Sequence, residues 1–262
     1  MGQWASVDLQ YGHVASALRE RGIAILPDLV SAEAAADILA YFKTKQVVGA
    51  DGSLVEPEGL PPGTAMAAYP LRTILENPSV LRLINAAPVL RIAADHLGCR
   101  PTLSSVGVRW SFPAAKSPAT TQLFHRDPDD WRFIKLFVYL TDVDSGAGPH
   151  SYVMHSSRNA GQIRSRAYSR HEIDRRYGRD ALCTITGPRG TAFLADTYGI
   201  HAGTSPTHAP RLILQAQYSL LPVFAFEYQP IVLQATEDLD PYVNRLLVAR
   251  PRSSCRSNAA SG

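Results

Sequence analysis

The chain has 262 residues and a mass of 28.5 kDa, with 45% apolar and 19% charged residues. This balance excludes an intrinsically disordered or collagen-like chain and supplies ample material for a buried core. The 26 basic and 23 acidic residues leave a net charge of +3, which is too small an excess to predict nucleic acid or a membrane surface as the partner.

The cysteines and the hydropathy of the chain constrain its setting. Cys99, Cys183 and Cys255 lie far apart without a CxxC spacing, which indicates neither a disulfide framework nor a thiolate zinc site. The opening residues, MGQWASVDLQ, lack a basic region followed by an apolar run, and no stretch reaches the roughly 18 apolar residues of a membrane span. We therefore expect a soluble protein in a reducing, cytoplasmic environment.

The first hundred residues predict mainly helices, with one early strand. HVASALRERG is amphipathic and ends at a glycine, and the apolar segment GIAILPDLV that follows predicts a short strand. Ser31 is expected to cap a helix over residues 32–45. A further helix is expected over residues 79–97, with a break at Pro88. Residues 49–70 hold glycines and prolines with little periodicity, which predicts a loop able to fold over a site.

The pattern changes after Pro101. Six short strand-like segments follow with turn signals between them: SVGVRWSF, KLFVYLTDV, LCTITG, GTAFLAD, LILQAQYSLL and EYQPIVLQA. Such a series predicts an all-β sandwich or barrel. Because no internal repeat or linker divides the chain, we expect one domain over residues 1–249, with a helical part over about 1–100 and a β core over about 101–235. Residues 250–262 predict a disordered tail.

A basic, partly helical insert over residues 158–180 interrupts the strands. Its arginines are interpreted as a solvated helix face rather than as a site for an acidic substrate: Arg164, Arg166, Arg175 and Arg176. Four histidines are interpreted as surface or hydrogen-bonded loop residues: His150, His155, His171 and His208.

The segment FHRDPDDW carries the sharpest local pattern. His125 and Asp127 stand two apart, so on a strand they point to the same side and can meet one metal ion. A second histidine is expected from a later strand, and His201 follows GTAFLAD, with Arg211 ten residues further on. Two histidines and one carboxylate leave three coordination positions open, as in non-haem Fe(II) oxygenases. An H-x-D pair alone is a weak signal, because most such pairs are incidental.

The order of five segments makes the pattern specific: VRWSFP, QLFHRDPDDW, KLFVYLTDVDSGAGPHSYVMHSS, ITGPRGTAFLADTYGIHAGTSP and APRLILQAQYSLL. Together they resemble the phytanoyl-CoA dioxygenase family of Fe(II)- and 2-oxoglutarate-dependent oxygenases, over about Ser105 to Leu221. The resemblance implies a mainly β fold with flanking helices, in which a double-stranded β-helix (a cupin-like jelly roll) follows a helical N-terminal region. One departure is MHSSR, where the family often has a glycine-serine-histidine run, so His155 lies near a motif position without matching it.

The resemblance also implies roles for individual residues. His125, Asp127 and His201 would be the iron ligands and the catalytic residues. Arg211 would pair with the distal carboxylate of 2-oxoglutarate, which a guanidinium grips through two parallel hydrogen bonds, and Thr204 would add a hydroxyl contact. The cofactors implied are Fe(II), 2-oxoglutarate and O2, with ascorbate as a candidate reductant.

The implied activity is hydroxylation of an unactivated C–H bond of a small molecule in specialised metabolism, with release of succinate and CO2. Asp127 argues against halogenation, because halogenating relatives replace this carboxylate by a small residue. Desaturation, epimerisation and ring formation use the same iron centre and stay open. Two alternatives are a cupin-like metal enzyme that does not use 2-oxoglutarate, which Arg211 disfavours, and a non-catalytic barrel that acts as a binding module. The substrate and the oligomeric state are not indicated.

Three further residues are candidates for contact with the substrate. Trp131 and Lys135 follow the ligand pair, where a substrate can be stacked or charge-paired, and Arg109 lies on the preceding strand, where it can face the pocket. The neighbouring Asp129 and Asp130 are typical of an ordinary turn.

Overall fold

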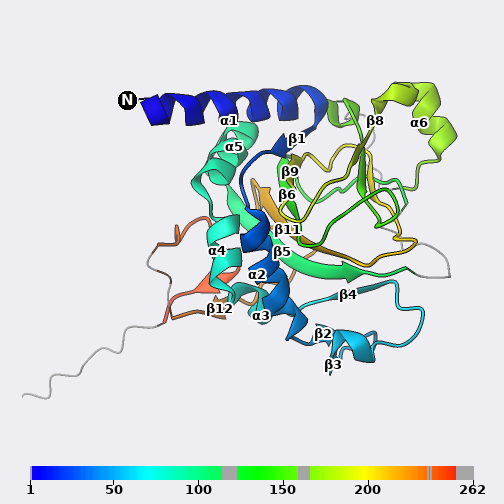
Figure 1. Ribbon diagram of the computed structural model, residues 1–262. Helices are drawn as coiled ribbons and strands as arrows, with labels where there is room; N and C mark the ends of the chain where they lie inside the picture. Colours follow the sequence, from blue (N-terminus) through cyan, green and yellow to red (C-terminus); the bar gives the residue numbers. More distant parts are fainter. Residues whose placement is uncertain (1, 114–122, 159–165, 235, 237, 252–262) are drawn as a thin grey trace, which may run out of the picture.

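The computed structural model describes residues 2–113, 123–158, 166–234, 236 and 238–251. Its N-terminal part contains the strand β1 (Ile23–Leu26), three shorter strands given below and five α-helices: α1 (Gly2–Arg21), α2 (Ala32–Lys43), α3 (Leu71–Leu75), α4 (Pro78–Ile84) and α5 (Ala87–Leu97). These helices lie along one side of the molecule and the sheets on the other (Figure 1).

Local sequence signals set the helix boundaries. The Ser31 hydroxyl accepts a hydrogen bond of 3.1 Å from the backbone N–H of Ala34, so α2 begins where the sequence predicts. The helix expected over residues 79–97 is divided into α4 and α5, and Pro88 stands in the first turn of α5, where a missing N–H costs nothing. Gly98 ends α5 in the left-handed conformation, at φ +75°.

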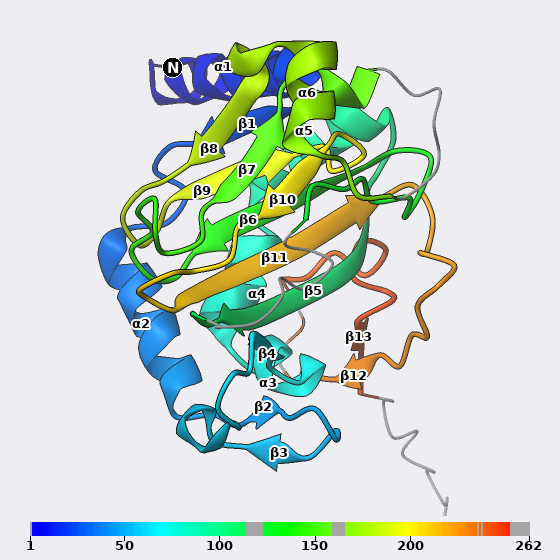
Figure 2. The same ribbon diagram turned by 90° about the vertical axis from the view of Figure 1, so that its right-hand side faces the viewer.

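Two antiparallel sheets form the β part. The larger has the strand order β1-β9-β6-β11-β5-β4-β2-β3, and the smaller has the order β10-β7-β8. The large sheet adds seven strands to β1: β2 (Val47–Val48), β3 (Leu54–Val55), β4 (Met66–Ala68), β5 (Thr102–Ser111), β6 (Phe133–Tyr139), β9 (Ala192–Ala195) and β11 (Arg211–Ser219). The small sheet contains β7 (His150–Val153), β8 (Leu182–Ile185) and β10 (His201–Gly203) (Figure 2).

Both faces of the large sheet are buried at its centre, and β6 is buried at every residue. One face packs on the helices, where Leu136 and Leu214 lie in the same apolar cluster as Phe42. The other face packs on the small sheet, where Phe137 lies in a cluster with Tyr152. The space between the two sheets is therefore the interior of the double-stranded β-helix.

The fold is mainly β with flanking helices, as the sequence predicts, but two segments differ. Residues 49–70 contain β3, β4 and a short helix, η1 (Pro57–Gly59), because β4 pairs with β5 and extends the large sheet. These strands have two or three residues, too few to show a period in the sequence. EYQPIVLQA was expected to be a strand of the core, but it yields only β12 (Ile231–Val232), which pairs with β13 (Val248–Ala249) outside both sheets.

The basic insert includes α6 (Arg170–Tyr177), which lies between the short helices η3 (Ser156–Arg158) and η4 (Arg179–Ala181). Arg175 and Arg176 are exposed, so they form a solvated helix face as expected. Arg164 and the end of the predicted tail, residues 252–262, lie outside the described residues. Within the described ranges, no helix combines the length and the apolar character needed to cross a membrane.

Candidate metal centre

Strand β10 of the small sheet and the segment around His125 bring the predicted ligands together. His125 forms an isolated β-bridge with His201, with a backbone hydrogen bond of 2.9 Å in each direction, and the N–H of Asp127 donates to the carbonyl of Thr197. Asp127 Oδ1 lies 3.3 Å from His125 Nε2, and Oδ2 lies 3.4 Å from His201 Nε2. One ligand atom from each of the three side chains lies within 4.8 Å of the others. This spacing fits a single divalent cation.

Backbone carbonyls orient both imidazole rings. His125 Nδ1 lies 2.8 Å from the carbonyl oxygen of Leu123, and His201 Nδ1 lies 3.0 Å from that of Gly199. A carbonyl only accepts hydrogen bonds, so Nδ1 carries the hydrogen and Nε2 keeps its lone pair toward the centre. Burial lowers the pKa of His201 to about 4, which keeps this ring neutral and able to bind a metal.

Asp127 is held in its ionised form. Burial opposes its charge, but His201, His125 and Lys135 together hold the pKa of Asp127 far below its usual range. Lys135 is buried, and its Nζ lies 2.6 Å from Asp127 Oδ2 and 3.0 Å from Asp129 Oδ2. The candidate substrate residue Lys135 is thus paired with two carboxylates, one of them in the triad.

The triad opens into a cavity of about 80 Å³ that also contains Arg211, the first residue of β11. Arg211 is buried, and its Nη2 donates to the Ser111 hydroxyl at 3.3 Å, while Nε and Nη1 have no partner among the described residues. Burial lowers the pKa of Arg211 to about 10, so the side chain stays charged at neutral pH. A buried charge without a counterion is costly, so this cavity fits an anionic ligand.

Ser111 is a site residue that the sequence analysis missed. It pairs with Arg211 in the register of β5 and β11, and it lies two residues from Arg109 on the same face of β5. The strand period would have placed Ser111 beside Arg109, but only the register between two distant strands brings it to Arg211.

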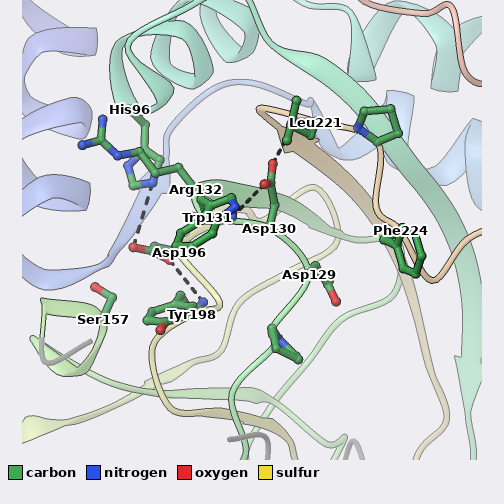
Figure 3. A pocket seen from close by; sticks show the side chains of 12 residues that line it. His96, Asp129, Asp130, Trp131, Arg132, Ser157, Asp196, Tyr198, Leu221 and Phe224 are labelled. Atoms are coloured by element: carbon green, nitrogen blue, oxygen red, sulfur yellow. Dashed lines mark hydrogen bonds and ion pairs between the residues drawn. The ribbon is translucent and has the colours of Figure 1, made fainter. Parts of the chain in front are cut away.

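The remaining predicted contacts of the substrate and co-substrate, Arg109, Thr204 and Trp131, lie in three different parts of the structure. Arg109 lines the metal cavity, and its buried Nε has no hydrogen-bond partner among the described residues. Thr204 is exposed and is not among the residues that line this cavity. Trp131 is 84% exposed and lines a separate cavity of about 690 Å³, in which Asp129 and Asp130 also lie (Figure 3). None of the three candidate metal ligands lines that cavity.

The histidines outside the triad require one correction. His150 was interpreted as a surface or loop residue, but it is buried at the start of β7, and its ring stacks on that of His201 at a centroid distance of 5.6 Å. Burial, together with His201 and Arg211, holds its pKa well below the usual value. His155 Nδ1 lies 2.9 Å from the carbonyl oxygen of Glu20, in agreement with a loop residue bonded to backbone. His171 and His208 are exposed.

Comparison with known proteins gives the fold a context. No protein-family model matches the sequence, and no curated protein matches it significantly. Among solved structures, the epimerase SnoN in complex with Fe3+, alpha ketoglutarate and nogalamycin RO is 19% identical, with a TM-score of 0.57 over 80% of this chain and 84% of SnoN. HygX from Streptomyces hygroscopicus, with nickel and 2-oxoglutarate bound, is 16% identical, with a TM-score of 0.56 over 86% of this chain and 92% of HygX.

A third structure, EctD from S. alaskensis with bound Fe, is 17% identical, with a TM-score of 0.55 over 90% of this chain and 86% of EctD. At these identities the likeness establishes the fold. The chain therefore shares the double-stranded β-helix fold of these three structures, and it carries a His-Asp-His candidate triad inside that fold. The structural match confirms the fold that the sequence analysis predicts.

Proposed function

We propose that this chain is an Fe(II)- and 2-oxoglutarate-dependent dioxygenase that oxidises a small molecule. The observation that carries the proposal is the convergence of two imidazole nitrogens and one carboxylate on a cavity that also contains a buried guanidinium without a counterion among the described residues. When bound, Fe(II) and 2-oxoglutarate would supply the activation of O2 for oxidation of a C–H bond.

Three side chains would hold the metal. His125, Asp127 and His201 offer three ligand atoms on one side, which leaves the opposite positions for the co-substrate and O2. The carbonyls behind both rings fix their orientation. Lys135 would act on the metal ligand rather than on the substrate, because its hydrogen bond to Oδ2 leaves Oδ1 of Asp127 for the metal.

Arg211 and Ser111 would bind the distal carboxylate of 2-oxoglutarate. The Nε and Nη1 donors of Arg211 have no partner among the described residues, and a bidentate carboxylate satisfies such a pair. The Ser111 hydroxyl lies close enough to add a third donor. Thr204, although exposed, stays a predicted contact of the co-substrate. Phe137 and Ile213 are the large apolar side chains in a lining that is otherwise mainly polar.

The expected outcome is hydroxylation of a C–H bond, with succinate and CO2 as co-products. The fold does not select this outcome by itself, because the similar structures include an epimerase and the carbocyclase SnoK from nogalamycin biosynthesis. The Asp127 carboxylate disfavours halogenation, since it occupies the metal position that a chloride would need. Trp131 stays a predicted contact of the substrate, and the large cavity that it lines contains none of the candidate metal ligands.

The uncompensated Arg211 also separates this proposal from its alternatives. A cupin-like metal enzyme that does not use 2-oxoglutarate has no need for a buried guanidinium beside its metal. A non-catalytic barrel has no need for a complete set of metal ligands. Both features lie in one cavity here.

Anaerobic titration tests the proposal directly. Addition of Fe(II) and 2-oxoglutarate to the metal-free protein should produce the visible charge-transfer band of an iron-bound 2-oxoacid. Metal binding without the band would support the cupin-like alternative, and the absence of both would support a binding module. The exposed His171 on α6 offers a matched control, because His171→Ala should leave the band unchanged.

A further inference from the structure

One row of paired residues crosses the inner face of the large sheet. Tyr139 of β6 pairs with Ile213 of β11, and Ile213 pairs with Arg109 of β5. Arg109 in turn pairs with Ala68 of β4, and Ala68 pairs with Val48 of β2. Directly paired residues face the same side of a sheet. The row therefore leads from the metal cavity to the short strands that extend the sheet.

Arg109 stands at the boundary between two cavities. It lines the metal cavity with Ile213, and it also lines a second cavity of about 320 Å³ with Val48 and Ala68. Pockets that enclose a small molecule measure roughly 300–1,000 Å³. The metal cavity, at about 80 Å³, falls well below that range, whereas the second cavity reaches it. The substrate thus has room beyond Arg109, on the side of β4.

The second cavity is apolar apart from Arg109. Its other walls include Leu60 and Met66, and the single hydroxyl side chain is that of Thr64. Leu60 and Thr64 belong to the segment that the sequence predicts as a loop able to fold over a site. This cavity fits the hydrocarbon part of a ligand and offers one cation for its polar end.

Arg109 has no counterion of its own among the described residues. Among the described residues no carboxylate lies within ion-pair distance of Arg109, and its buried Nε has no hydrogen-bond partner. The carboxylate that attracts it, Asp127, is already bonded to Lys135 and belongs to the triad. Arg211 provides a second guanidinium nearby. With 2-oxoglutarate bound to Arg211, the charge of Arg109 is left for the anionic group of another ligand.

We propose that the substrate is an amphiphilic carboxylate whose anionic group binds Arg109 and whose apolar body fills the cavity between β4 and the segment around Leu60. The inference rests on the proposed function for the identity of the reaction, but not for the binding itself. One planar guanidinium matches one carboxylate, whereas a phosphate dianion would call for more cationic donors than the described lining holds. The anionic end of the substrate then lies on the metal side of the cavity.

Calorimetric titration with two matched probes tests this assignment. Hexanoate and hexanamide have the same chain and differ in charge. We expect wild-type protein to bind hexanoate about tenfold more tightly than hexanamide, and we expect Arg109→Gln to abolish that preference. The affinity for 2-oxoglutarate, titrated separately, should change by less than about twofold in this variant. Arg175→Gln, on the exposed face of α6, is the control for loss of a positive charge.

A second variant, at Ala68, tests the same cavity even if Arg109→Gln does not fold. Ala68 is exposed in the cavity and pairs with Arg109, so Ala68→Leu should fill the space and weaken both probes by about fivefold while the preference for hexanoate persists. Arg109→Lys should retain part of the preference, because it keeps the charge without the planar fork.

Three results would overturn the assignment. They are equal binding of the two probes by wild type, no binding of either probe, and loss of 2-oxoglutarate affinity in Arg109→Gln with hexanoate binding unchanged. The last result would show that Arg109 binds the co-substrate and not the substrate. If hexanoate binds through Arg109 but the protein binds neither Fe(II) nor 2-oxoglutarate, the carboxylate site stands and the proposed dioxygenase function fails.

Discussion

The ammonium group of Lys135 lies 2.6 Å from Oδ2 of Asp127, the carboxylate of the candidate triad. The same ammonium lies 3.0 Å from Asp129 Oδ2, so it joins the metal ligand to the turn that follows it. A partner of this kind fixes which carboxylate oxygen faces the metal and holds the ligand in place before the metal binds.

Replacement of Lys135 should therefore weaken metal binding. Lys135→Met retains the buried hydrocarbon stem but leaves Asp127 Oδ2 without its donor, and partners of this kind typically account for about 10- to 100-fold in metal affinity. Ni(II) titration by calorimetry measures the effect, and Lys43→Met, at the exposed last residue of α2, serves as control. Tighter metal binding in Lys135→Met would show instead that the ammonium competes with the metal for Asp127.

The three ligands should each be indispensable for the metal complex. His125→Ala, Asp127→Ala and His201→Ala each remove one of three ligand atoms, so each should abolish the charge-transfer band with Fe(II) and 2-oxoglutarate. Far-ultraviolet circular dichroism confirms that the variants are folded. A band of normal intensity in His201→Ala would contradict the assignment and redirect it to the neighbouring His150, whose Nε2 has no partner among the described residues.

Arg211 and Ser111 should differ in the size of their effect on 2-oxoglutarate. Arg211→Gln truncates the buried charge that we propose to bind 2-oxoglutarate, and it should cost about 2–5 kcal/mol, or roughly 30-fold or more in the 2-oxoglutarate concentration needed for half saturation. Ser111→Ala removes one neutral donor and should cost about 1 kcal/mol. Titration of the charge-transfer band measures both, while Fe(II) affinity should stay constant. Unchanged 2-oxoglutarate affinity in Arg211→Gln would remove Arg211 from the site.

The sequence predicted the strands that have a long apolar run, such as β5, β6 and β11, and the helices that have caps. It did not predict β7 and β10, which have four and three residues and exist because they pair with each other. The error at His150 follows from this omission, since a histidine outside any predicted strand looks like a loop residue. Burial of its ring needs the small sheet to be in place.

In the candidate site, too, the sequence shows the residues that form a local pattern but not the contacts that depend on strand pairing. The two-residue spacing of His125 and Asp127 and the later His201 are visible along the chain. The contacts of Lys135 with Asp127, and of Ser111 with Arg211, are not visible, because they depend on how β6 and β5 align with their neighbours. A register shift of one residue would turn these side chains to the other face.

A partly buried pair outside the metal centre should govern the pH dependence of stability. Burial raises the pKa of Asp196 to about 6 and lowers the pKa of His96 to about 4, and His96 Nε2 lies 3.9 Å from Asp196 Oδ2 (Figure 3). The contribution of Asp196 to stability is present below its ordinary pKa of 3.8 and is lost as the pH rises through 6. The contribution of His96 is present above 6.5 and is lost as the pH falls through 4. The two trends oppose each other in the wild type.

Single substitutions should separate the two trends. Asp196→Asn keeps an oxygen that can accept from the Tyr198 N–H but cannot ionise, so its unfolding free energy relative to wild type should rise by about 2 kcal/mol from pH 4 to pH 7. The unfolding free energy of His96→Gln relative to wild type should fall from pH 4 to pH 7, because the wild type gains stability over this range as the histidine loses its proton. Urea unfolding at several pH values measures both differences, with Asp180→Asn as the exposed control. Profiles parallel to wild type would show that neither group changes its pKa on folding, because a difference that does not vary with pH requires equal proton uptake in both states.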